Sequence, residues 1–465
     1  MCFFNFFEFL LKETSRVRPL RNARHPFYDY CTKTLAHIRQ QGRYRVFTPL
    51  AREAEHFPLY DYAPKNEQDN VAPSLSPLLS EELLSEQVSS QKRDVVVWST
   101  NDYLGMGVDP DVQEAAISAI RDHGVGSGGT RNIAGHSPLH AELERELASL
   151  HGKEAGLLFG SGYVSNQASL QTILSSTPEK QNTPWVCFSD RLNHASMIAG
   201  IKAARGAQVV IFEHNDLADL EAKLAAAPLE APKLIAFESV YSMEGDIADI
   251  GGICTLARRY GALTYLDEVH AVGLYGQKGG GVSQRDGVAE QVDIIEGTLA
   301  KSFGVYGGYI TGAANIVDFL RSTASGFIFT TSLPPALVKA ALVSVRKVRA
   351  EHWRREALFE RVATFQQRLR GAGIPFTLTP SHIIPIPIGE AETCKRISHR
   401  LLEEFGHYAT PINYPTVPQG SERLRITPGP FHTDAMMTAM IHALAICLRD
   451  EGLIKPYIPP HNVVR

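Results

Sequence analysis

Three kinds of reactive side chain stand at the ends of apolar, strand-like runs. Lys301 closes the run IIEGTLAK, Asp267 and His270 end LTYLDEVH, and His194 follows WVCFSDRLN where a helical pattern begins. A lysine among small and apolar residues is costly unless its ammonium is paired or neutralised. Taken singly, each residue has an ordinary alternative, because Asp267 could cap a helix, His194 could begin one, and Lys301 could be a surface lysine.

Together these residues match what pyridoxal phosphate needs from a protein. The amine of Lys301 could form a Schiff base with the cofactor aldehyde, which removes the cost of a buried ammonium. The carboxylate of Asp267 could pair with the pyridine nitrogen and keep it protonated, since an opposite charge in contact shifts a pKa by about 1–3 units. Ligands of such sheets bind beyond the carboxyl ends of the strands, so we expect the cofactor there.

A turn rich in small residues could hold the cofactor phosphate. FGSGYVSNQ, at residues 159–167, has the pattern of a strand, a turn and a helix, and the N–H groups of a helix start favour an anion. Gly307 and Gly308 permit close approach of the backbone near Lys301. The phosphate contacts that we predict are Ser161, Gly162, Tyr163, Thr298, Thr330 and Thr331.

The elements that must position these groups alternate along the chain from Val95. The runs GLLF, WVCFSD, VVIF, LIAFESV, LTYLDEV and IIEGTLA predict strands, and HASMIAGIKAARG, LADLEAKLAAA and IGGICTLARRYG predict the helices between them. This alternation favours an α/β fold with a mostly parallel sheet and helices on both faces.

The remaining sequence predicts two further parts. From Leu337 one long helical stretch leaves the sheet, followed by the strands HIIPIPI and RLRITP and two more helices, which indicates a smaller α+β domain. Residues 63–94 are rich in Ser, Pro, Glu and Gln and predict a loop-like insertion. We therefore expect an N-terminal segment at 1–94, a large cofactor-binding domain at 95–340 and a small domain at 341–465.

Composition narrows the classes of partner. The 465-residue chain has a net charge of −4 and no apolar run long enough for a bilayer, so we expect neither nucleic-acid binding nor membrane insertion. Its six cysteines form no C-x-x-C pair, so we expect no metal site and a reducing compartment. An arginine-containing stretch at residues 12–25 suggests a mitochondrial presequence and the matrix, but Glu8 and Glu13 favour the cytoplasmic alternative.

Several stretches resemble a known enzyme family. LDEVHAVGLYG followed by GTLAKSFGVYGGYI resembles the α-oxoamine synthases, pyridoxal phosphate enzymes of fold type I in the class II aminotransferase superfamily. GSGGTRNIAG, NHASMIAGI, INYPTVPQGSERLRITP and QGRYRVF are similar to the branch that joins glycine to succinyl-CoA with release of CoA and CO2, the first step of heme and tetrapyrrole biosynthesis. The resemblance implies a large domain with a mostly parallel seven-stranded sheet, a smaller α+β C-terminal domain, and a homodimer with shared active sites.

The resemblance also implies roles for the residues around the cofactor. Lys301 corresponds to the Schiff-base lysine, Asp267 to the partner of the pyridine nitrogen, and His194 to the imidazole stacked on the ring, so these three are the predicted catalytic residues. His270 and Ser242 correspond to groups near the phenolic oxygen. Thr298 corresponds to a phosphate contact, as do Thr330 and Thr331 from the opposite subunit.

Substrate contacts follow from the same comparison. Arg425 corresponds to the arginine that holds the glycine carboxylate, and Arg45 resembles the arginine that binds the succinyl carboxylate. The further substrate contacts are Asn101, Ser189 and Thr416. One departure is Glu213, which stands where relatives usually have a basic residue near CoA, so the affinity for CoA is left open.

The sequence is also compatible with other activities of the same family. A sibling such as 2-amino-3-ketobutyrate CoA ligase, 8-amino-7-oxononanoate synthase or a serine-using acyltransferase would share most motifs, although Arg45 favours a short acyl chain ending in a carboxylate. A paralogue serving secondary metabolism would share all of them. A non-catalytic relative would have lost the lysine, whereas Lys301 is present.

Overall fold

The computed structural model describes residues 25–62, 93–176 and 183–454, which fall into two units divided between Thr48 and Pro49. In the N-terminal unit, α2 (Pro26–Gln40) begins with proline at its first position, and the ring of its cap His25 accepts a hydrogen bond from the Phe27 N–H at 3.2 Å. No side chain of α2 is buried. Arg45 follows this helix with an exposed side chain.

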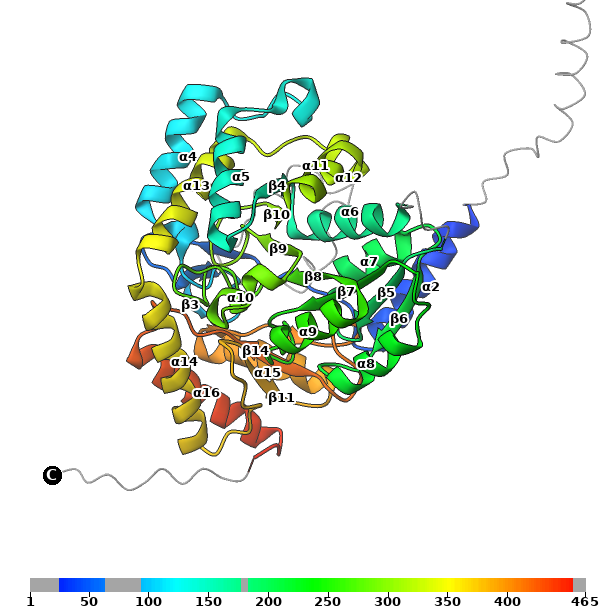
Figure 1. Cartoon of the computed structure of the whole chain (residues 1–465). Helices are drawn as coiled ribbons and strands as arrows, with labels where there is room; N and C mark the ends of the chain where they lie inside the picture. The colour runs from blue at the N-terminus through cyan, green and yellow to red at the C-terminus, as the bar shows by residue number, and fades with distance from the viewer. Residues whose placement is uncertain (1–24, 63–92, 177–182, 455–465) are drawn as a thin grey trace, which may run out of the picture. The chain divides into compact units, whose positions relative to one another are not determined.

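A seven-stranded sheet forms the centre of the second unit (Figure 1). Its order is β4 (Ala155–Phe159), β10 (Gly308–Gly312), β9 (Ile294–Thr298), β8 (Ala262–Asp267), β7 (Lys233–Glu238), β5 (Val186–Asp190) and β6 (Gln208–Phe212). Six strands run in one direction and β10 runs in the other. The predicted mostly parallel seven-stranded sheet is confirmed, and so are all six of the strands that the apolar runs predicted.

Helices cover both faces of this sheet because alternate strand residues point to opposite sides. In β4, Leu157 and Phe159 pack into one hydrophobic core, whereas Leu158 packs into the other. The first core includes α6 (Gly162–Ser175), α7 (Ala195–Ala203), α11 (Ala314–Thr323) and α12 (Ser325–Ile328). The second includes α5 (Pro138–His151), α8 (Leu217–Ala226) and α9 (Ile250–Tyr260).

The long helical stretch expected after Leu337 is two helices, α13 (Pro335–Ala350) and α14 (Trp353–Gly371). Side chains at the break account for the separation. The guanidinium of Arg355 donates to the carbonyl of Val348 at 2.6 Å and so occupies an acceptor that a continuing helix would use. Arg354 turns instead to the buried carboxylate of Asp109, with 2.6 Å between Nη2 and Oδ2. The prediction of a single helix was therefore wrong.

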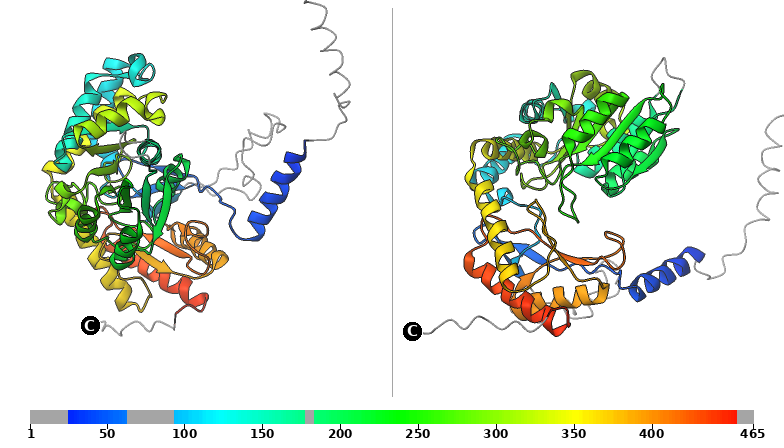
Figure 2. Two further views of the ribbon diagram at one scale, coloured as in Figure 1. Left: turned by 45° about the vertical axis from the view of Figure 1, so that its right-hand side comes forward. Right: turned by 60° about the horizontal axis from the view of Figure 1, so that its bottom comes forward.

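Two smaller sheets complete the second unit. One has the antiparallel order β11 (Ile384–Pro387), β14 (Arg423–Ile426) and β13 (Pro411–Ile412). The other has the order β1 (Leu50–Arg52), β2 (Leu59–Tyr62), β3 (Arg93–Val97) and β12 (His407–Tyr408). Figure 2 shows α15 (Ala391–Phe405), α16 (Asp434–Asp450) and the strands of the C-terminal region gathered beside the large sheet. The remaining elements are η4 (Met106–Val108), α4 (Pro110–His123), η5 (Arg131–Gly135), α10 (Val282–Arg285) and η6 (Ala289–Gln291).

The predicted insertion is shorter than expected at its C-terminal end, because Arg93 and Asp94 pair with β2 as part of β3. The rest of that prediction, residues 63–92, lies outside the described residues, as do residues 12–24 of the arginine-containing N-terminal stretch. Strand β3 also pairs with β12 in parallel, which joins the start of the predicted large domain to the predicted small one. The division at 94/95 and 340/341 stays a prediction.

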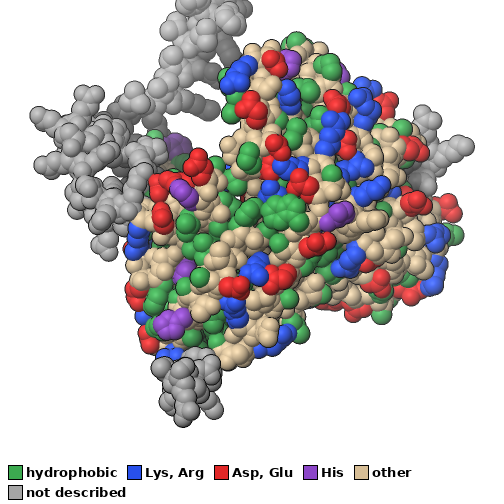
Figure 3. All heavy atoms as spheres, turned by 90° about the vertical axis from the view of Figure 1, so that its left-hand side faces the viewer, with side chains coloured by type: hydrophobic (Ala, Val, Ile, Leu, Met, Phe, Trp, Pro, Cys, Tyr) green, Lys and Arg blue, Asp and Glu red, His purple; other side chains and the backbone are tan. Residues whose placement is uncertain are grey.

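Acidic and basic side chains are interspersed on the face of the molecule drawn in Figure 3. Among the described residues, no helix combines the length and the apolar character needed to cross a bilayer. Within the same residues, no three His, Cys, Asp or Glu side chains are grouped so that they could hold a metal ion. The five described cysteines are free thiols.

Candidate active site

Three acidic residues stand side by side across neighbouring strands at the carboxyl edge of the large sheet. Glu238 of β7 is in register with Asp267 of β8, and Asp267 is in register with Glu296 of β9. All three are buried. Burial raises the pKa of Glu238 and of Glu296 well above the usual range, and the negative charge of Asp267 raises both further. The row therefore favours protonated glutamates on both sides of Asp267.

Asp267 is joined to His194 through side chains of α6 and α7. The Asn166 amide donates to Asp267 Oδ2 at 2.8 Å and to the Ser196 hydroxyl at 3.1 Å. That hydroxyl lies 2.6 Å from Nδ1 of His194, which caps α7 and whose side chain is exposed. The backbone N–H of Val269 donates to the other carboxylate oxygen of Asp267 at 2.8 Å. The predicted carboxylate and imidazole are thus held in one network.

Lys301 follows β9 and is half-buried. Its Nζ lies 2.8 Å from Nε2 of His270, whose Nδ1 lies 2.8 Å from the hydroxyl of Tyr103. Burial lowers the pKa of Lys301 to about 8, although the charge of Asp267 opposes that change. Burial also lowers the pKa of His270 well below its usual range, with the charges of Lys301 and Arg425 acting in the same direction. A neutral His270 can therefore accept a hydrogen bond from the lysine.

Arg425 of β14 is buried and contacts other segments of the chain. Its Nη2 donates to the Tyr103 hydroxyl at 2.8 Å, and its Nη1 donates to Asn101 Oδ1 at 3.3 Å. Its Nε donates to the backbone carbonyl of Ser242 at 2.9 Å. Asn101, Ser242 and Arg425 are therefore joined to one another, with Ser242 contributing its carbonyl to the arginine.

The turn before α6 and the start of that helix hold residues that the sequence predicts as phosphate contacts. The hydroxyl of Ser161 caps α6 by accepting from the Val164 N–H at 3.2 Å. A Cβ atom on Gly308 would lie 2.4 Å from the carbonyl carbon of Ser161, so only glycine lets β10 reach this turn. Thr298 directs its hydroxyl to the carbonyl of Gly307 at 3.0 Å. Tyr163, in the first turn of α6, is 46% exposed.

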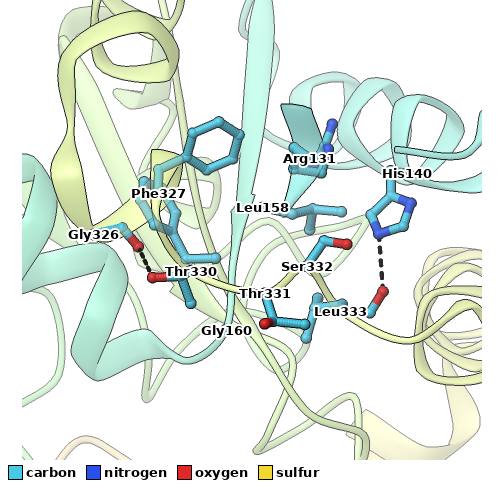
Figure 4. Close-up of a pocket in the computed structure, with 11 residues that line it drawn as sticks. Arg131, His140, Leu158, Gly160, Gly326, Phe327, Thr330, Thr331, Ser332 and Leu333 are labelled. Atoms are coloured by element: carbon cyan, nitrogen blue, oxygen red, sulfur yellow. Dashed lines mark hydrogen bonds between the residues drawn. The ribbon is translucent and has the colours of Figure 1, made fainter. Parts of the chain in front are cut away.

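Thr330 and Thr331 lie in a small pocket with Gly160, Arg131 and His140 (Figure 4). The Thr330 hydroxyl donates to the carbonyl of Gly326 at 2.6 Å, and Thr331 forms an isolated antiparallel bridge with Thr130. Both threonines are exposed. Lys301 is not among the residues that line this pocket.

The other predicted substrate contacts stand on three further segments of the chain. Ser189 is buried at the end of β5, where its hydroxyl accepts from the Asn193 amide at 2.9 Å. Thr416 lies in an exposed turn in which its N–H donates to the carbonyl of Asn413 at 3.0 Å. Arg45 belongs to the N-terminal unit.

The residues of the site that were not predicted include Tyr103, Asn166, Glu238 and Glu296. Signals for them were present in the sequence. Tyr103 stands two positions after Asn101, and Asn166 lies inside the quoted turn-and-helix stretch. Glu238 and Glu296 are acids within otherwise apolar strands, which is unusual unless the site uses them.

The donor set fits pyridoxal phosphate. The fit rests on an amine of lowered pKa at Lys301, a buried carboxylate at Asp267 and a helix N-terminus at Gly162. Gly308 lets β10 lie against the N-terminus of α6. Strand β10 pairs with β9, and Lys301 follows β9 in the chain.

The lowered pKa of Lys301 predicts how the cofactor-free protein reacts with pyridoxal phosphate. The neutral amine is the nucleophile, so the rate of covalent capture should rise with pH through a midpoint near 8, and not near the ordinary value of 10.5. The measurement is the rate at which visible absorbance appears after mixing, between pH 6 and 11. Lys301→Ala is the control and should give no such signal. A midpoint near 10.5 would contradict the burial of this amine.

Comparison with known proteins agrees with this geometry. The family model described as aminotransferase class I and II matches residues 93–444. The 5-aminolevulinate synthase of Rhizobium meliloti (strain 1021) is 51% identical over 418 residues, covering 90% of this chain and 96% of the relative. The 5-aminolevulinate synthase of Bradyrhizobium diazoefficiens is 49% identical over 420 residues, covering 90% and 95%.

Solved structures show the same fold. The serine palmitoyltransferase of Sphingomonas wittichii has a TM-score of 0.73 and 30% identity, covering 78% of this chain and 89% of that one. The 8-amino-7-oxononanoate synthase of Francisella tularensis has a TM-score of 0.65 at 22% identity, covering 77% and 99%, and so shows the fold alone. The chain belongs to the class I and II aminotransferase family and, within it, to the 5-aminolevulinate synthases.

Proposed function

We propose that the protein condenses glycine with succinyl-CoA to give 5-aminolevulinate, CoA and CO2, the first step of tetrapyrrole and heme biosynthesis. The observation that carries this proposal is the assembly of Lys301, Asp267 and Arg425 at one edge of the sheet in a chain 51% identical to a 5-aminolevulinate synthase. The reaction requires an amine that can act as a base, a carboxylate that pairs with the cofactor ring, and an arginine that binds the substrate carboxylate.

Pyridoxal phosphate, when bound, accepts the electron pair left on the glycine Cα after proton removal. Lys301 would bond to its aldehyde, Asp267 would pair with its ring nitrogen, and His194 would cover its ring. The turn of Ser161, Gly162 and Tyr163 would hold the phosphate with Thr298, and His270 and Ser242 would lie near the phenolic oxygen.

The chain's own groups then handle the proton and the substrate carboxylate. With a pKa of about 8, Lys301 can take a proton from the glycine Cα near neutral pH and return it later. Neutral His270 can accept a hydrogen bond from the Lys301 amine and so orient it. Arg425 offers a planar pair of N–H groups that can grip a carboxylate with two hydrogen bonds.

Substrate selection is assigned to Arg45, with Asn101, Ser189 and Thr416 as further contacts. Glu213 forms an exposed ion pair with Arg191. An acid in this position would weaken the binding of CoA phosphates unless Arg191 compensates for it. The KM values for different acyl-CoAs must therefore be compared on the same variant of the protein.

The test is CoA release with glycine over a panel of acyl-CoAs, for the unmodified enzyme and for Arg45→Leu. A charge-assisted hydrogen bond contributes about 1.5–3 kcal/mol. Its loss should raise the KM for succinyl-CoA by about 10- to 100-fold, since each 1.4 kcal/mol is tenfold. Butyryl-CoA, which lacks the terminal carboxylate, should be nearly indifferent to the substitution.

Two outcomes would count against these assignments. Equal loss with succinyl-CoA and butyryl-CoA would make Arg45 structural. Preference of the unmodified enzyme for acetyl-CoA or a long acyl-CoA would favour a sibling activity such as 2-amino-3-ketobutyrate CoA ligase or 8-amino-7-oxononanoate synthase.

The active unit is proposed to be a homodimer with shared sites. Support comes from the exposure of Thr330 and Thr331 together with exposed apolar side chains on two segments, the one that holds these threonines and the one around Thr130, which pairs with Thr331. Phe329 is 80% exposed, Ile133 is 69% exposed and Val125 is 75% exposed, and such side chains are typical of an interface when they form a patch.

Shared sites predict complementation between two inactive chains. A chain with Lys301→Ala keeps both threonines, and a chain with Thr330→Val and Thr331→Val keeps its lysine. Their heterodimer would contain one complete site, so mixing should restore activity. Heterodimers that form, as shown by two different affinity tags, and yet remain inactive would place each site within a single subunit.

For the compartment we retain the mitochondrial matrix as the proposal and the cytoplasm as its alternative. The relative from Emericella nidulans is described as mitochondrial and is 46% identical over 434 residues. The more similar Rhizobium and Bradyrhizobium relatives are bacterial, which favours the alternative. Fractionation of the source cells distinguishes the two.

A further inference from the structure

His214 lies between two carboxylates outside the catalytic residues. Its Nδ1 is 2.9 Å from Asp190 Oδ1, and its Nε2 is 2.6 Å from Asp246 Oδ2. A neutral imidazole has one N–H and could donate to only one of them, whereas the protonated ring donates to both. Burial opposes protonation, but the hydrogen bonds with the two acids outweigh it and raise the pKa of His214 to about 10. Tyr241 packs edge-on against the ring, with centroids 4.4 Å apart.

The next residue binds the same two acids. Asn215 has a φ of 54°, in the left-handed region that asparagine tolerates better than most residues. Its backbone N–H donates to Asp190 Oδ2 at 3.1 Å, and its amide donates to Asp246 Oδ2 at 2.8 Å. The turn after β6 therefore presents consecutive donors to one pair of carboxylates.

Asp190 belongs to the loop that ends in His194. It is the last residue of β5, and its Oδ1 also accepts from the N–H of Leu192 at 2.8 Å, which shapes the turn. Four residues after Asp190, the backbone N–H of His194 donates to Glu238 at 2.6 Å. The position of the Asp190 carboxylate thus helps to set where α7 and its histidine cap begin.

Asp246 belongs to the loop that supports Arg425. Within this loop the N–H of Tyr241 donates to the carbonyl of Asp246 at 3.2 Å, which closes a tight turn around Ser242. The carbonyl of Ser242 accepts from Arg425 Nε at 2.9 Å, and the carbonyl of Met243 accepts from Arg423 Nη1 at 2.8 Å. One side of the loop therefore holds the arginines of β14, and the other side is held by His214.

We propose that His214 is a positioning residue for glycine binding, because its bridge between Asp190 and Asp246 fixes the loop whose Ser242 carbonyl orients Arg425. The proposal rests on the proposed function, in which Arg425 grips the glycine carboxylate. His214 acts through Asp246 and Ser242 and touches no substrate itself.

Loss of the bridge has a specific consequence. Without a donor on Nε2, the Asp246 carboxylate keeps the Asn215 amide but loses its charged partner, and the Ser242 turn is free to shift. Arg425 would still be charged but less well aligned, so glycine binding should weaken. Asp190 keeps the backbone N–H donors of Leu192 and Asn215, so the loop that ends in His194 should stay in place. Binding of succinyl-CoA, which is assigned to other residues, should not weaken.

The experiment compares the holoenzyme with the His214→Gln variant. The glutamine side chain has a single amide donor group, so it can donate to only one of the two carboxylates. The matched control is His56→Gln, because His56 is also paired with an acid, Glu53, at 3.0 Å, but on the exposed surface. The measurements are kcat, the KM for each substrate, the thermal midpoint, and the Kd of glycine from the absorbance change of the bound cofactor without succinyl-CoA.

We expect His214→Gln to raise both the KM and the Kd of glycine about tenfold, equivalent to about 1.4 kcal/mol, with kcat and the KM for succinyl-CoA little changed. His56→Gln should leave all four unchanged. Asp246→Asn should reproduce the glycine effect, and the double variant should lose little more than either single variant, since both break one bridge.

A lower thermal midpoint with unchanged glycine KM and Kd would make His214 merely structural and overturn the proposal. Equal increases in the KM of both substrates would overturn it as well. If His214→Gln does not fold, Asp246→Asn carries the same comparison. Failure of the unmodified enzyme to make 5-aminolevulinate would refute the proposed function, whereas its glycine-dependent absorbance change tests the present proposal separately.

Discussion

Lys301→Ala is expected to abolish turnover, with a fall of at least about 1,000-fold, because one side chain serves both as the covalent anchor of the cofactor and as the base. The fold should survive. The substitution removes the hydrogen bond between the Lys301 amine and His270. It also removes the cost of desolvating the lysine charge, which offsets that loss. The variant should therefore unfold at a temperature no lower than that of the unmodified protein.

Borohydride reduction followed by peptide mass analysis measures the covalent role directly. In the unmodified enzyme the cofactor mass should appear on the peptide that contains Lys301 and not on the peptide of Lys202, which is exposed on α7. In Lys301→Ala the cofactor should bind but wash away after reduction and denaturation. Substantial turnover by the variant would contradict the assignment of this lysine.

Asp267→Asn should retain some cofactor but lose most activity. Asparagine keeps an oxygen that can accept from Asn166, so the local network need not collapse. It carries no negative charge, however, and an opposite charge in contact is worth about 1–3 pKa units on the ring nitrogen. We therefore expect kcat to fall by about 10- to 1,000-fold, since each pKa unit corresponds to 1.36 kcal/mol.

Glu296→Gln is the matched control for that substitution. It is the same acid-to-amide change in the neighbouring strand, at a position where the raised pKa already favours the neutral form. It should therefore lose far less activity than Asp267→Asn. Comparable losses of activity in the two variants would mean that Glu238, Asp267 and Glu296 act through their summed charge. Near-normal turnover by Asp267→Asn would mean that another residue contacts the pyridine nitrogen of the cofactor.

Strand prediction from the sequence succeeded at the six apolar runs, including the largely exposed strand β6, and failed at the fully buried strand β10. That strand, GYITG, begins and ends with glycine, and its conformation depends on pairing with β4 and β9 rather than on its own residues. The split between α13 and α14 was missed for a similar reason. Residues 351–352 have no proline or glycine, and the break depends on side-chain contacts with distant segments.

Some residues of the candidate site could likewise be predicted from local sequence, and others could not. Lys301, Asp267 and His194 could be predicted because each stands at the end of a strand or the start of a helix, where parallel topology brings such ends together. Asn166 lies 101 positions from Asp267 and Tyr103 lies 322 positions from Arg425, and local sequence does not encode such contacts. The roles of Asn166 and Tyr103 therefore become apparent only in the folded chain.

The register of Glu238, Asp267 and Glu296 also connects unfolding with proton release. In the folded protein both glutamates hold protons at a pH where an exposed glutamate, with a pKa of about 4.3, has lost them. Unfolding within that range should therefore liberate protons, and the free energy of unfolding should decrease as pH rises across it. Calorimetric enthalpies of unfolding should consequently vary with the ionisation heat of the buffer, in proportion to the protons that this row gives up.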